Sequence, residues 1–168
     1  MKKISLALLF TIGILGTVSV RAHSYDLYSA QEPSLDLFGF YGSRDKGGGN
    51  SGAAGPGVGF NYFFTQNLGL FADTYADAFT LPYLLNANAV FRYPIPRTAI
   101  APYAFAGFGR EWWHAPQWLG DVGGGVEYRL TPAQMKMPLG LFVDVRGVFA
   151  AQTADYAVVR FGLRFKFK

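Results

Sequence analysis

Hydrophobic and polar residues alternate one by one over most of this chain, and residues 156–167 give the clearest example. Every second side chain from Ala157 to Phe167 is apolar, whereas the residues between them include Arg160 and Arg164. Successive side chains of a β-strand point to opposite faces. A period of two therefore predicts a strand with one apolar face and one largely polar face.

The alternation recurs in blocks of about ten residues, which are separated by residues that favour turns. The eight blocks cover residues 34–44, 56–65, 68–79, 83–93, 100–111, 119–130, 139–150 and 156–167. Short strands at this even spacing are typical of an antiparallel all-β barrel. Small residues dominate block 100–111, and the pattern there does not decide which residues share a face.

The polar faces of the other blocks carry equal numbers of acidic and basic residues in mid-strand. In block 68–79, for example, Leu68, Leu70, Ala72 and Ala76 oppose Asp73 and Asp77. The acids are Asp36, Asp73, Asp77, Glu127 and Asp144, and the bases are Arg92, Arg129, Arg146, Arg160 and Arg164. Charges removed from water are tolerated when they are paired, and the fork of an arginine can hold several carboxylate oxygens. We therefore predict that these residues form an ion-pair network inside a barrel. Within it, Asp144 and Arg146 are expected to lie near the two arginines of block 156–167.

Two classes of barrel share this alternation: a soluble, lipocalin-type barrel buries its apolar face, and a membrane barrel turns that face to lipid. The apolar faces here are rich in aromatic residues, lysine is nearly absent from the blocks, and hydrophobic residues make up 51% of the chain. These features favour lipid on the outside. We predict an eight-stranded antiparallel transmembrane up-and-down β-barrel with a side-chain-filled interior, because about eight strands leave room for little else. An ion-selective lumen is the alternative.

Residues 1–22 have the features of a secretory signal peptide. Two lysines precede an apolar stretch over residues 4–20, and the small residue Ala22 offers a cleavage point. A retained membrane helix is the alternative, since the stretch is near the lower length limit for a span. We expect cleavage, which leaves residues 23–33 as a periplasmic lead-in and residues 34–168 as the outer-membrane barrel.

Charge and cysteine content exclude several classes of protein. The formal net charge is +4, but cleavage would remove Lys2, Lys3 and Arg21 and leave the mature chain close to neutral. No basic surface then remains to argue for a nucleic-acid partner. The chain has no cysteine, which excludes a disulfide scaffold, a thiolate zinc site and a cysteine nucleophile.

The connections between blocks predict how the barrel is oriented. Both ends of such a barrel normally lie in the periplasm, so the turns after the second, fourth and sixth blocks are expected there. The loops expected outside cover residues 45–55, 80–82, 112–118 and 151–155, and the first of them is rich in glycine and is expected to be mobile. Trp112, Trp113 and Trp118 are predicted to be interface aromatics, because an indole is apolar with one polar N–H. A ligand platform is the alternative for them.

The final strand also carries a motif that resembles the outer-membrane assembly signal, formed here by Arg160, Gly162, Phe165 and Phe167. With eight blocks and a signal peptide, residues 34–167 look like the small outer-membrane protein A-like and opacity-type barrels. Members usually end on the aromatic residue, whereas Lys168 follows here. The resemblance implies a porin-like, integral protein of the Gram-negative outer membrane that the barrel-assembly machinery inserts. It also implies outer-membrane lipid and lipopolysaccharide as neighbours and a monomeric state.

Some barrels of this size are enzymes that remodel the acyl chains of lipopolysaccharide, which takes an activated serine with a histidine and a carboxylate. After cleavage the chain would keep only His23 and His114, and no serine adjoins His114. A pair of His114 with Glu111 or Asp121 is the remaining enzymatic alternative. The sequence has no metal-ligand spacing, so we expect no catalytic residue, no metal and no cofactor. A structural or surface-interaction role is predicted, with a lipid A-modifying enzyme or a narrow pore as alternatives.

Overall fold

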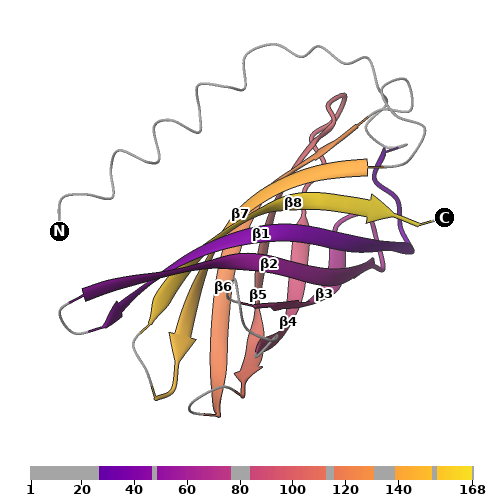
Figure 1. Cartoon of the computed structure of the whole chain (residues 1–168). Coiled ribbons are helices and arrows are strands. Elements are labelled where there is room, and N and C mark those ends of the chain that lie inside the picture. The colour runs from indigo at the N-terminus through magenta and orange to yellow at the C-terminus, as the bar shows by residue number, and fades with distance from the viewer. Residues whose placement is uncertain are drawn as a thin grey trace.

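The computed structural model describes residues 27–46, 49–76, 84–112, 116–130, 139–152 and 155–167. Its eight antiparallel strands close into one barrel in chain order, with β8 returning to β1 (Figure 1). The strands are β1 (Glu32–Lys46), β2 (Gly49–Phe63), β3 (Leu68–Tyr75), β4 (Leu84–Arg92), β5 (Ile100–Glu111), β6 (Gln117–Arg129), β7 (Leu139–Ala150) and β8 (Tyr156–Lys166). The predicted up-and-down barrel is confirmed.

The two ends of the barrel differ in what lies there. β1 begins and β8 ends at the same end, where Ser34 pairs with Lys166; we call this the terminal end. The opposite end, where β1 turns back into β2, is the hairpin end (Figure 1). In the part of the chain that the structure describes, no helix has the length and apolar character needed to cross a membrane.

The first hairpin is longer than the sequence pattern predicts. Asp45 pairs with Asn50 and Lys46 with Gly49, so residues 45–46 and 49–55 are strand, and the expectation that residues 45–55 form a loop is wrong there. The ladder bonds join backbone groups and need no particular side chain. The alternating apolar and polar residues earlier in the strand set the register of the hairpin, and a glycine-rich segment can then continue it.

The apolar residues of the alternation face outward, as the sequence predicts. In β8, Phe161 is 62% exposed, whereas Arg160 and Arg164 are 4% and 5% exposed. Exposed apolar side chains of all eight strands form the outer wall, which includes Leu37, Val58, Phe60, Leu68, Leu70, Leu85, Phe91, Phe108, Val122, Val126, Leu141, Val143, Val145, Phe149, Val159 and Leu163. One position departs from the prediction. Ala76 is buried because β3 has already ended at Tyr75, and its N–H donates to the carbonyl of Pro56.

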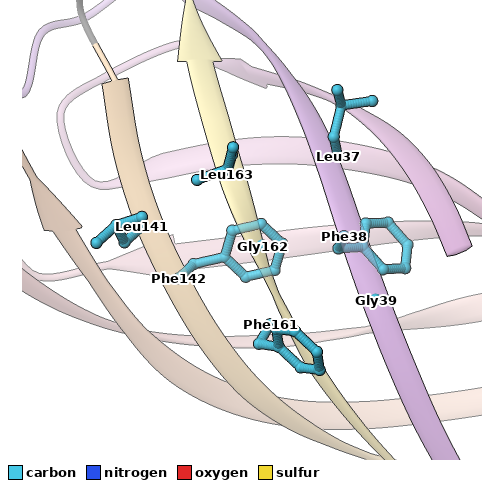
Figure 2. A pocket seen from close by; sticks show the side chains of 8 residues that line it. All are labelled: Leu37, Phe38, Gly39, Leu141, Phe142, Phe161, Gly162 and Leu163. Carbon is cyan, nitrogen blue, oxygen red and sulfur yellow. The ribbon is translucent and has the colours of Figure 1, made fainter.

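A shallow groove crosses this outer wall where β7, β8 and β1 meet (Figure 2). The outward residue of β1 at this point is Gly39, and the ring of Phe161 lies over it: a Cβ there would be 3.1 Å from Phe161 Cζ. The other residues that line the groove are Leu37, Phe38, Leu141, Phe142, Gly162 and Leu163. All of its side chains are apolar, so it is part of the hydrophobic wall and has no group for chemistry.

Inward-facing glycines make room for large side chains inside the barrel. Gly162 of β8 lies in register between Phe38 of β1 and Phe142 of β7, whose ring centroids are 6.2 Å apart. A Cβ on Gly162 would lie 2.6 Å from Phe38 Cβ, which is too close. Gly123 sits in the same way between Phe105 and Arg146. Alternation of large and small residues between neighbouring strands thus fills the interior.

The structure also decides the phase of β5, which the sequence leaves open. Tyr103 and Phe105 point inward and are buried, whereas Ala104 and Ala106 are exposed on the outer wall. Both faces are apolar here, so polarity alone cannot tell them apart. The ring of Phe105 occupies the space that Gly123 of β6 leaves free, because a Cβ on Gly123 would lie too close to Phe105 Cζ.

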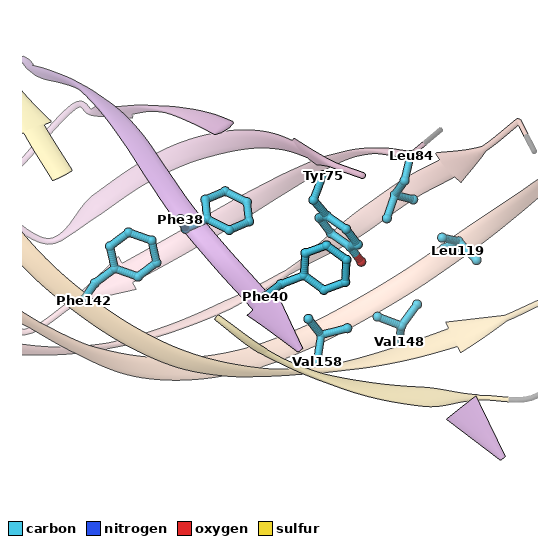
Figure 3. Close-up of a cluster of buried hydrophobic side chains, with 8 residues drawn as sticks. All are labelled: Phe38, Phe40, Tyr75, Leu84, Leu119, Phe142, Val148 and Val158. Atoms are coloured by element: carbon cyan, nitrogen blue, oxygen red, sulfur yellow. The ribbon is translucent and has the colours of Figure 1, made fainter. Parts of the chain in front are cut away.

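The interior is not polar throughout, which differs from the sequence-based expectation. At the hairpin end, buried apolar side chains of six strands form one cluster. Figure 3 shows these side chains converging. Phe40 and Tyr75 are in contact there, with ring centroids 4.5 Å apart. The same buried cluster includes Leu84, Leu119, Val148 and Val158, together with Phe38 and Phe142. Burial of these side chains closes the barrel at that end with a hydrophobic core.

Candidate functional site

The charged side chains inside the barrel form two groups, and the central group joins opposite walls. Arg160 of β8 donates from Nε to Asp144 Oδ1 at 2.8 Å and from Nη1 to Asp73 Oδ2 at 2.8 Å. Arg146 of β7 donates to both carboxylate oxygens of the same Asp73. Asp73 lies on β3, which is four strands away from β7 around the ring. These ion pairs therefore span the lumen.

Neutral groups donate hydrogen bonds to two carboxylates of the central group, Asp144 and Asp73. The hydroxyl of Tyr103 donates to Asp144 Oδ2 at 2.6 Å, and the amide of Asn86 donates to Asp73 Oδ1 at 2.9 Å. Asp121 adds a third carboxylate, with Oδ2 3.7 Å from Arg146 Nη1. Hydrogen bonds to the remaining lone pairs are what makes a buried ion pair tolerable.

The second group lies toward the terminal end. Arg164 holds Asp36 through two parallel bonds of 2.8 Å and 2.7 Å and donates from Nη1 to Glu127 at 2.6 Å. Arg129 donates to both Glu127 and Glu32. Arg92 Nη1 donates to Glu32 Oε1 at 3.1 Å. Glu127 and Glu32 are thereby each shared between arginines, and Asp36 is joined to them through Arg164, so the group is a network rather than a set of separate pairs.

Tyr28, in the segment before β1, covers this second group from the terminal end. Its side chain is fully buried, and its hydroxyl donates to the carbonyl of Ala99 at 2.8 Å. The guanidinium carbons of Arg92 and Arg129 lie 4.7 Å and 5.1 Å from the centre of its ring. Burial, the main cause, raises the pKa of the Tyr28 hydroxyl well above its usual range. The lead-in thus contributes an aromatic cap to the interior.

The structure brings nine residues of the sequence-predicted network into the barrel interior, and Asp77 lies outside the described residues. Asp144 lies beside Arg160 as expected, and Arg146 joins Arg160 through Asp73. Arg164 differs from the expectation, because it pairs with Asp36 and Glu127 in the group nearer the terminal end.

Sequence reasoning missed several members of the network. Glu32 was expected in the periplasmic lead-in, but it is the first residue of β1 and a partner of Arg92 and Arg129. Glu32 is four residues before Asp36 and therefore lies on the same face of the strand. Extending the alternating pattern of block 34–44 back by two residues would have found it. Tyr103 could not be found in this way, because the faces of its strand are both apolar.

The predicted interface aromatics and assembly motif are placed as follows. Trp112 and Trp118 lie at the hairpin end and are 51% and 57% exposed; Trp113 and the candidate base His114 lie outside the described residues. The motif residues alternate along β8 and just beyond it: Arg160 and Gly162 face the interior, and Phe165 and Phe167 face outward.

Among the described residues, no three His, Cys, Asp or Glu side chains are placed to hold a metal ion.

No protein-family model and no curated protein matches this chain. Solved structures do match, at low sequence identity. The Neisserial surface protein A is 16% identical with a TM-score of 0.61, over 80% of this chain and 97% of that one. The N-terminal barrel of Pseudomonas aeruginosa OprF is 16% identical with a TM-score of 0.55, over 83% and 99%. Ail, the attachment invasion locus protein of Yersinia pestis, is 13% identical with a TM-score of 0.58, over 82% and 99%.

These likenesses define the class of the fold. The chain is a closed eight-stranded antiparallel barrel of the kind found in small outer-membrane proteins, with transmembrane barrels as its structural neighbours. An apolar outer wall around a charged interior is the arrangement that such barrels require.

Proposed function

We propose that the protein is an integral barrel of the bacterial outer membrane with a structural or surface-interaction role and no catalytic activity. The observation that carries this proposal is the distribution of side chains: an apolar wall outside, and inside a charged network closed by Tyr28 at one end and by apolar side chains at the other. Such a molecule is anchored by lipid contact and has no open route through its centre.

The route to the membrane is part of the same proposal. Residues 1–22 act as a cleaved secretory signal, and the barrel-assembly machinery reads Arg160, Gly162, Phe165 and Phe167. The protein then lies as a monomer among outer-membrane lipid and lipopolysaccharide, without a nucleic-acid partner. The terminal end faces the periplasm and the hairpin end faces outward, which is supported by the length of the β1–β2 hairpin.

The role at the cell surface follows from what the barrel presents there. The long hairpin projects from the hairpin end, where β2 pairs with β3 only from Gly57 onward. The structural neighbours include the Neisserial surface protein A and the attachment invasion locus protein Ail, and both share this architecture. Loops and hairpins on a rigid scaffold are where binding residues usually lie.

The filled interior leads to a direct test of the role. We expect purified, refolded protein to give no steady conductance in planar bilayers, because ion pairs of Asp73 cross the lumen and apolar side chains seal the hairpin end. The same preparation should migrate differently on gels before and after boiling, as a closed barrel resists unfolding by detergent. A steady conductance in a sample that shows this mobility shift would contradict the closed interior and favour the narrow pore.

A further inference from the structure

Arg110 is a charged residue on the apolar outer wall of the barrel. Among the outward side chains that the structure describes on the eight strands, all but Arg110 are uncharged. Its neighbours in sequence, Gly109 and Glu111, are buried and belong to the inward face. In register it lies between Leu85 of β4 and Trp118 of β6, both of which are exposed on the outer wall.

Arg110 lies at the hairpin end of the barrel, because β5 ends there and Arg110 is its penultimate residue. Its guanidinium carbon lies 5.0 Å from the centre of the Trp118 ring. Phe108 packs against the same indole, with ring centroids 6.3 Å apart, and Trp112 is exposed nearby in sequence. Aromatic residues gather at the level of lipid headgroups, so Arg110 lies at the membrane interface.

The guanidinium has no carboxylate partner among the described residues. The five arginines of the described interior network each have one. Glu111, the nearest acid in sequence, accepts a hydrogen bond from Gln117 on the inward face. A charge on the lipid face is costly at the middle of the bilayer and is tolerated near its surface. Stacking on Trp118 uses the face of the guanidinium and leaves its N–H edge directed to other groups.

We propose that Arg110, positioned by Trp118, binds the phosphorylated headgroup of an outer-leaflet lipid, the lipid A part of lipopolysaccharide. The planar fork of arginine matches two phosphate oxygens, and the negative headgroup supplies the counter-charge that the described part of the protein does not. This inference rests on the proposed function, since it needs the hairpin end to face outward. It goes further by naming the headgroup and the residue that recognises it.

The test measures the thermal stability of the folded barrel in detergent micelles while bis-phosphorylated lipid A is titrated in. We expect lipid A to raise the Tm of the wild-type protein, because a ligand that binds the folded state stabilises it. Arg110→Gln should need about tenfold more lipid A for the same shift, since it loses charge-assisted hydrogen bonds. Arg97→Gln, an exposed arginine in the turn at the opposite end, is the matched control and should respond like wild type.

Two further ligands and one further variant make the test decisive. Dephosphorylated lipid A and inorganic phosphate alone should leave the Tm almost unchanged. Trp118→Leu removes the ring that lies against the guanidinium, and it should weaken the response to lipid A several-fold. If Arg110→Gln fails to fold, Trp118→Leu serves as the test variant in its place. An unaltered response of either folded variant, or equal effects of both forms of lipid A, overturns the inference. The gel mobility shift is recorded for each variant, so loss of the barrel itself is recognised separately.

Discussion

Replacing Asp73 by asparagine is expected to destabilise the barrel by about 3–5 kcal/mol, the usual cost of breaking a buried ion pair. Asp73 is the counter-ion of both Arg146 and Arg160, and all three side chains are buried. Asparagine keeps the shape of the side chain but removes the charge, so two guanidiniums are left in the interior with too little compensation. Urea unfolding in lipid vesicles, followed by tryptophan fluorescence, measures the difference.

Two comparisons isolate this effect. Asp155→Asn changes an exposed carboxylate whose Oδ1 accepts from Ala150 N, and it should cost no more than about 0.5 kcal/mol. Removing Arg146 together with the charge, as Asp73→Asn with Arg146→Met, should restore part of the stability, because no unpaired cation then remains at that position. A loss below about 1 kcal/mol in the single variant would mean that the interior charges do not depend on one another.

Introducing a charge on the outer wall is expected to give the second large effect. Phe161→Arg should destabilise the barrel by about 2–4 kcal/mol in vesicles, because this is the cost of an arginine that faces lipid near the bilayer midplane. Phe161 is at the middle of β8 and is the most exposed of the large apolar side chains described. The same unfolding assay reports the change.

The control for this variant uses the same strand and the same face. Ala157 is the second residue of β8, close to the hairpin end, and it is exposed. Ala157→Arg should cost at most about 1 kcal/mol, since the cost of a lipid-facing charge falls toward the interface. Equal losses at the two positions, or no loss at Phe161, would argue that water rather than lipid surrounds the barrel.

The strand phases could be read from sequence where the two faces differ in polarity. In β8, Arg160 and Arg164 lie on one face and Phe161 and Phe165 on the other. The charges stay out of lipid only if the arginine face is turned inward. In β5 the inward Tyr103 and Phe105 are as apolar as the outward Phe108, and the pattern carries no such signal. The ring of Phe105 fits inside because Gly123 of β6 lies opposite it, and only the strand register reveals this pairing.

The residues of the interior network were largely predictable, whereas their partners were not. A buried arginine in a strand needs an acidic partner, and this can be stated without knowing how the strands pair. Which acid it meets depends on the curvature of the closed sheet. Asp73 and Arg146 are far apart in sequence and on opposite walls, and they meet because the lumen is narrow. Glu32 was missed because its strand begins before Pro33, where the alternation is hard to see.

The central claim is that the apolar wall contacts acyl chains, and spin labels on single cysteines test it most directly. The chain has no native cysteine, so each variant carries one label. Labels at Val143, Val159 and Phe161, in vesicles, should collide often with oxygen, which concentrates in the bilayer, and rarely with a water-soluble nickel reagent. A label at the exposed Ala151 should show the reverse. Frequent collisions of the nickel reagent with the three wall positions in folded protein would contradict the claim.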